Sequence, residues 1–172
     1  NGELPYLRPE LGLVAARASN QQETEARIRL AHEAAGRVDA YTGPPVYDRH
    51  SLTFSTGNVQ IHSISVALEL SDQTTALDRS RRADPHHIAA LPKSRRGHHH
   101  MDLARAWLWD GSRDRALAEL EKAEHIAPQL VRNHPIARAT LRKILYAERA
   151  ATRERLRGMS NRFSLDDQQL FP

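Results

Sequence analysis

Six side chains have the types and the spacing that could bind a ligand in a groove lined by helices. These candidates are Asn58, His62, Ser65, Met101, Arg105 and Trp109. Asn58, His62 and Ser65 stand at i, i+4 and i+7, which places them on one helical face. Arg105 and Trp109 also share a face, and a guanidinium beside an indole could hold a carboxylate and stack on a peptide side chain. In the alternative interpretation Asn58 caps a helix and Trp109 only packs.

Clustered histidines raise the question of a metal site. His86–His87 and His98–His100 are the two runs. Adjacent residues on a helix point about 100° apart, so a run of histidines does not converge on one ion. Zinc sites use a spacing such as i and i+4, with a further ligand brought in by the fold. We therefore predict no metal site and no cofactor.

Catalytic groups are also sparse. Asp102 stands at workable helical spacing from His98 and His99, but no Ser or Cys nucleophile lies in a recognisable elbow. Asp102 and Arg105, at i and i+3, are more simply an ion pair within a helix. The sequence also lacks a glycine-rich phosphate loop. The chain is predicted not to be an enzyme.

The elements that would position these residues are helices. The expected helices are Glu10–Ser19, Glu23–Ala40, Val59–Leu70, Gln73–Ala83, Ser94–Trp109, Ser112–Ile126, Pro135–Ala151 and Thr152–Phe163. Val59–Leu70 also alternates like a strand near its end, but its length favours a helix. Asp84–Pro85 and Ala127–Pro128 are interpreted as helix ends, since proline disfavours helix in the residue before it. The tail 166–172 is expected to fray.

One helix pair carries a repeat signature. Residues 97–130 span 34 positions, the period of a tetratricopeptide repeat. The signature positions are filled by Leu103, Ala104, Trp107, Gly111, Ala116, Leu120, Ala123 and Pro128. Small residues let two helices approach, and large ones fill the groove between them. Residues 72–77 echo residues 112–117, although Ala76 and Ala116 are 40 positions apart rather than 34.

The predicted fold is therefore all-α, a tetratricopeptide-like α-solenoid of about three helix pairs plus C-terminal capping helices. We expect a single domain over residues 1–165 with one concave surface. A composition of 40% hydrophobic and 27% charged residues is typical of a globular domain. The chain has no cysteine and no apolar run long enough to span a bilayer, so we expect a cytoplasmic protein without membrane contact.

Basic residues gather late in a chain whose formal net charge is +4. Nine Arg or Lys residues lie between Arg132 and Arg162, against Glu148 and Glu154. This stretch could meet phosphate or an acidic partner. The other interpretation is a solvated helix face, which needs no partner.

The chain resembles a family of bacterial regulators. The segments that carry the resemblance are Leu103–Trp107, Asp110–Gly111, Ala116–Leu117, Ile126–Pro128, His134–Pro135, Phe54–Val59, His62 and Val66–Leu70. They resemble the C-terminal half of actinobacterial XRE-type helix-turn-helix transcriptional regulators, over roughly residues 11–145. Ser55–Thr56 stands where the family commonly has Gly-Pro. The resemblance implies a DNA-binding head upstream of Asn1, so no residue of this chain is expected to read DNA.

Two functions are compatible with these observations. The first is the ligand-sensing domain of a transcriptional regulator, which forms a homodimer and binds a small molecule or peptide in its concave groove. The second is a stand-alone adaptor that binds the tail of another protein in the same groove. The fold alone does not separate them, because one fold serves many functions.

Overall fold

The computed structural model describes residues 21–39, 55–147 and 152–165, and every regular element in these ranges is a helix. The all-α prediction is confirmed for this part of the chain, and Val59–Leu70 is helical rather than extended. The expected helix Glu10–Ser19 and the tail 166–172 lie outside the described residues. The chain divides into two compact units between Leu91 and Pro92. This division does not test the prediction of one repeat domain.

The first unit contains α2 (Gln21–Asp39), α3 (Thr56–Glu69), α4 (Gln73–Arg82) and α5 (Pro85–Ala89). Each of the last three begins at a side-chain cap. The Ser55 hydroxyl accepts a hydrogen bond from the N–H of Asn58. The carboxylates of Asp72 and Asp84 likewise accept from backbone N–H groups in the first turns of α4 and α5. Such caps satisfy donors that a helix start leaves without an intrahelical partner.

One arginine ties three helices of the first unit together. Arg79 on α4 donates to both carboxylate oxygens of Glu25 on α2, at 2.6 and 2.7 Å. The same guanidinium donates to the carbonyl of Ser63 on α3 at 2.6 Å. Apolar contacts add to this link, among them Ile28 of α2 against Val66 of α3. The polar and apolar contacts together fix α2 on the α3–α4 pair.

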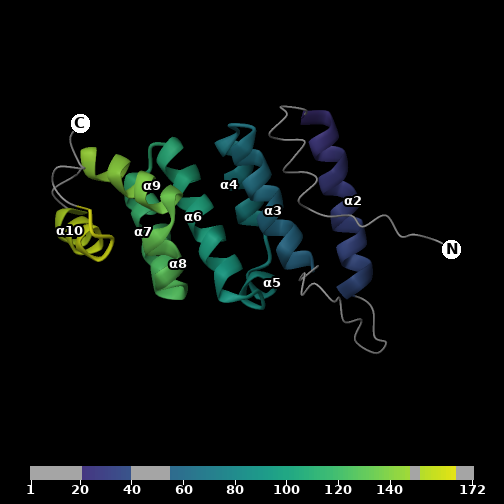
Figure 1. Cartoon of the computed structure of the whole chain (residues 1–172). Helices are drawn as coiled ribbons and strands as arrows, with labels where there is room; N and C mark the ends of the chain where they lie inside the picture. The colour runs from purple at the N-terminus through teal and green to yellow at the C-terminus, as the bar shows by residue number, and fades with distance from the viewer. Residues whose placement is uncertain (1–20, 40–54, 148–151, 166–172) are drawn as a thin grey trace. The chain divides into compact units, whose positions relative to one another are not determined.

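The second unit contains α6 (Lys93–Trp109), α7 (Arg113–Ile126), α8 (Pro128–Asn133), α9 (Pro135–Tyr146) and α10 (Arg153–Arg162). Figure 1 shows α6 and α7 running side by side in opposite directions. One core unites the five helices. Its fully buried members include Leu117, Leu120, Leu141, Ile144, Leu156, Met159 and Phe163. The second unit is thus an all-helical core closed at its C-terminal end by α10.

The two units contain the same helix–turn–helix geometry at positions 40 residues apart. The N–H of Asp72 donates to the carbonyl of Ala67 at 2.9 Å, and the N–H of Ser112 donates to that of Trp107 at 2.8 Å. This bond closes a Schellman turn, which requires a left-handed residue after the helix. Ser71 (φ 59°) fills that position in α3–α4, and Gly111 (φ 81°) fills it in α6–α7. The echo in the sequence is therefore a structural equivalence.

A short third helix completes each motif. α5 and α8 begin at Pro85 and Pro128, where the sequence was interpreted only as ending the preceding helices. That interpretation was incomplete, because proline is well suited to the first position of a new helix. We call α3–α5 the first copy of the three-helix motif and α6–α8 the second copy. A spacing of 40 exceeds the 34 positions of a tetratricopeptide repeat, so a tetratricopeptide stack stays a prediction.

Candidate functional site

One face of the first helix in each copy carries a stripe of polar side chains. The first stripe consists of Asn58, His62, Ser65 and Glu69 on α3. The second stripe consists of His98, Asp102, Arg105 and Trp109 on α6. Both follow the spacing i, i+4, i+7, i+11, and each member of one stripe stands 40 positions from its counterpart. The equivalence adds His98 and Asp102 to the candidate residues. The similarity of segments 40 positions apart could have indicated both from the sequence.

Asn58 is the most constrained member of the first stripe. It lies inside the first turn of α3 and is only 4% exposed. The interpretation of Asn58 as a helix cap is wrong, since Ser55 is the cap and Asn58 is the residue that it caps. The Asn58 Oδ1 atom is buried and has no hydrogen-bond partner among the described residues. A buried acceptor without a donor costs about 1–3 kcal/mol, and a ligand N–H would relieve that cost.

Arg105 occupies the centre of the second stripe. Its guanidinium carbon lies 5.3 Å from the centroid of the Trp109 ring, and its NH1 atom lies 3.4 Å from Asp102 Oδ1. The expected ion pair is thus present, although 3.4 Å is long for a charge-assisted hydrogen bond. Trp109 is 40% exposed, so a large part of the indole remains open to a second planar or apolar group. The second stripe therefore offers a charged and an aromatic contact together.

The six predicted candidates are divided between the two units. Asn58, His62 and Ser65 belong to the first unit, whereas Arg105 and Trp109 belong to the second. Met101 is 2% exposed and lies in the apolar core of the second unit, so the structure does not place it on the stripe. Each stripe is a candidate site within its own unit. A groove that joins them stays a prediction.

The histidine run on α6 has three separate surroundings. His98 Nδ1 lies 3.0 Å from the carbonyl of Ser94, and His100 Nδ1 lies 2.6 Å from Glu119 Oε2. His99, which stands between them in the sequence, is buried, and its Nδ1 has no hydrogen-bond partner in the described ranges. Burial, followed by the charge of His100, lowers the pKa of His99 to about 4. Within the described residues, no three His, Cys, Asp or Glu side chains converge as metal ligands would.

Glu119 anchors the polar contacts beside this run. It accepts hydrogen bonds from His100 and from Lys122, the latter at 2.8 Å. Burial alone would raise the pKa of the Glu119 carboxyl, but these two donors outweigh burial and lower it. Because Glu119 is ionised and held by both donors, it acts as a structural anion between α6 and α7 rather than a proton donor.

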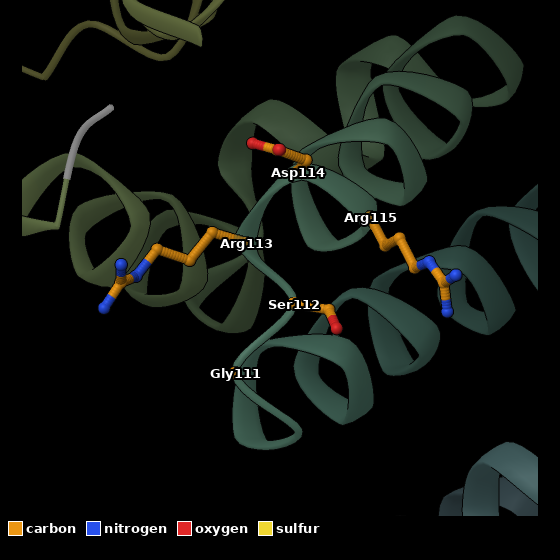
Figure 2. A pocket seen from close by; sticks show the side chains of 5 residues that line it. All are labelled: Gly111, Ser112, Arg113, Asp114 and Arg115. Carbon is orange, nitrogen blue, oxygen red and sulfur yellow. The ribbon is translucent and has the colours of Figure 1, made fainter. Parts of the chain in front are cut away.

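Two open hollows lie in the second unit, and neither contains a stripe residue. The first, of about 350 Å³, is lined by residues 111–115 at the start of α7. Figure 2 shows the Arg113 and Arg115 side chains pointing to opposite sides of it. The second, of about 390 Å³, is lined by Glu121, Glu124, His125, Pro128, Arg132 and Arg162. There Glu124 already accepts from Arg132 and Arg162, so the charges neutralise one another.

Comparisons with known proteins were made for the chain as a whole. Protein-family models, curated proteins and solved structures give no match to it. Among the helices that the structure describes, none is both long and apolar enough to cross a membrane.

Proposed function

We propose that this chain is a ligand-binding helical domain for a peptide or small molecule, and that the stripe on α3 and the stripe on α6 are its binding surfaces, each within its own unit. Following the resemblance stated above, the domain would serve as the sensing half of a helix-turn-helix transcriptional regulator. The ligand would bind from the side of the first helices, as in a solenoid groove. Dimerisation belongs to the same proposal, whereas DNA contact is assigned to the helix-turn-helix head of the regulator and to no residue of this chain.

The observation that carries the proposal is the buried side-chain oxygen of Asn58, Oδ1. Protein interiors satisfy buried polar atoms in the great majority of cases, so an exception indicates either stored strain or a missing partner. Asn58 shares its face with two partly buried polar residues, His62 and Ser65, one and two turns further along α3. A ligand that carries N–H groups, such as a peptide backbone, would supply the donor that Oδ1 lacks. A core position would be filled by an apolar side chain instead.

The second stripe supports the same function from different chemistry. The exposed indole of Trp109 and the adjacent guanidinium of Arg105 are the residue types that dominate binding hot spots. Arg105 has one long contact to a carboxylate, so a ligand anion could bind it with better geometry than Asp102 does. The two stripes would then recognise uncharged and charged groups respectively.

Thermal unfolding in the presence of short peptides and small metabolites tests this proposal. A ligand that binds only the folded state raises Tm by mass action. Asn58→Ala and Arg105→Ala should reduce the shift, whereas Asn161→Ala, an exposed asparagine on α10, should leave it unchanged. Stabilisation that survives both stripe variants would contradict the assigned site. Stabilisation by peptides alone would favour the adaptor role over small-molecule sensing.

A further inference from the structure

His134 caps the start of α9 with its imidazole ring. It has an extended backbone (φ −80°, ψ 126°), and its Nδ1 accepts the N–H of Ile136 at 3.3 Å. Pro135 has no N–H, so Ile136 carries the first backbone donor of the helix. Because an N–H donates to it, Nδ1 of His134 must be unprotonated. The cap thus exists only in the neutral form of this histidine with its proton on Nε2.

A second imidazole lies against this cap. The rings of His98 on α6 and His134 are edge-on, with centroids 5.1 Å apart. His98 Nδ1 contacts the carbonyl of Ser94, which can only accept, so that nitrogen carries a proton in every charge state. Protonation of both rings would bring two positive charges together. A charge on His98 therefore disfavours the charged form of His134.

Two arginines near the start of α9 make contacts of their own. Arg138 donates to the carbonyls of Arg132 and Phe163, and the Arg132 guanidinium pairs with Glu124. On α6, Asp102 is the acidic group that acts on His134. Burial, and then His98, lower the pKa of His134, while Asp102 opposes them. The charge state of His134 at the contact between α6 and α9 thus depends on both His98 and Asp102.

We propose that His134 and His98 form a proton-operated joint between α9 and α6. When His134 takes up a proton at Nδ1, the acceptor for Ile136 disappears and a positive charge appears at a helix N-terminus, where the macrodipole disfavours it. Acidification through the histidine range therefore releases the first turn of α9. Since Asp102 also belongs to the second stripe, the joint connects that stripe to the position of α9.

Nuclear magnetic resonance titration of the whole chain measures this directly. We expect the amide signal of Ile136 to follow the His134 ring, with a common midpoint below 6.5. His98→Gln should raise the His134 midpoint by removing repulsion, and Asp102→Asn should lower it by removing attraction. An Ile136 amide that does not move with the His134 ring would overturn the joint. A His134 midpoint that is unchanged in both variants would also overturn the proposal, since burial would then be the only cause of the lowered pKa of His134.

Thermal unfolding gives an independent test with a variant that retains a helix cap. Asn is a strong helix cap and does not titrate, so His134→Asn should match the wild type near pH 7.5. Near pH 5 the variant should melt above the wild type, by about 2–4 °C for a loss of one cap. His86→Asn, an exposed histidine of the first unit, should retain the wild-type pH dependence. Equal pH dependence of His134→Asn and the wild type would refute the proposal.

Discussion

A Cβ atom placed on Gly57 would lie 2.4 Å from the carbonyl oxygen of His87, so the first turn of α3 meets the backbone of α5 directly. No real Cβ contact is this short. The second copy repeats the arrangement, where a Cβ on Gly97 would lie 3.0 Å from the Ala127 Cβ just before α8. In both copies a glycine lets the short third helix cross the first helix.

Gly57→Ala should destabilise the protein by about 1–3 kcal/mol, the usual cost of overpacking, because the obstacle is backbone and cannot rotate away. Gly36→Ala is the matched control. Gly36 also lies in a helix, but nothing lies within 4 Å of its Cβ position. That control should gain about 0.5–1 kcal/mol from better helix propensity. Urea unfolding measures both, and equal stability of the two variants would contradict the close approach.

The two Schellman turns allow a reciprocal exchange. Ser71→Gly should stabilise the protein and Gly111→Ser should destabilise it, each by about 1 kcal/mol, because both positions have left-handed backbones that favour glycine. Neither exchange alters a buried side chain. Thermal unfolding of the two single variants and of the double exchange measures the effect. If the turns are equivalent, the double variant should return close to wild-type stability.

Helix positions were largely predictable from the sequence, because apolar periodicity and cap residues are local signals. The paired helices α6 and α7 end within one residue of the expected limits. The short helices α5 and α8 escaped prediction for a physical reason. A proline after an aspartate or alanine can end one helix or begin the next. The outcome depends on a distant glycine, Gly57 or Gly97, that leaves room for the short helix to pack.

The candidate site was predictable only in part. Spacing placed Asn58, His62 and Ser65 on one face, but it could not show that Ser55 rather than Asn58 caps the helix. Spacing also could not separate Met101, which points into the core, from Arg105 one turn later. His134 stayed hidden because its role depends on the contact with His98 across two helices. Local periodicity predicts the helices but not the contacts between them.

His99→Leu should remove part of the acid sensitivity of folding. The pKa of His99 is lowered by burial and then by His100, to about 4. The unfolded chain therefore binds the proton more tightly, and the stability associated with this histidine is present above pH 6.5 and lost as the pH falls toward 4. That contribution amounts to about 3–4 kcal/mol in total, at about 1.4 kcal/mol for each unit of the lowered pKa.

Leucine suits the site because Val59, the equivalent residue of the first copy, is fully buried and apolar. Replacing a buried, unsatisfied nitrogen with an apolar group should be nearly neutral at pH 7.5. Near pH 5 the variant should be more stable than the wild type by chemical denaturation. His125→Gln, an exposed change on α7, should have no effect on the pH profile. A His99→Leu profile that parallels the wild type would show that the buried imidazole does not titrate with folding.

Two glutamates of α7 hold α10, and their unequal burial predicts unequal effects. Glu124 accepts two hydrogen bonds from Arg162, at 2.5 and 2.6 Å, and one from Arg132, and its side chain is 7% exposed. Glu121 pairs with Arg155, but its side chain is 34% exposed. Exposed ion pairs contribute about 0–1 kcal/mol, since water and salt screen them.

Glu124→Gln should therefore loosen α10 by about 1–2 kcal/mol, because the buried carboxylate is shared by two guanidiniums that remain partly hydrated. Glu121→Gln should cost less than half as much. Hydrogen exchange of the α10 amides measures both, with the α4 amides of the first unit as an internal reference. Raising the salt concentration should speed α10 exchange in the wild type and in Glu124→Gln more than in Glu121→Gln, because Glu121→Gln has already lost the exposed pair that salt screens. Equal exchange in the two variants would mean that Leu156, Met159 and Phe163, rather than the ion pairs, hold α10 in place.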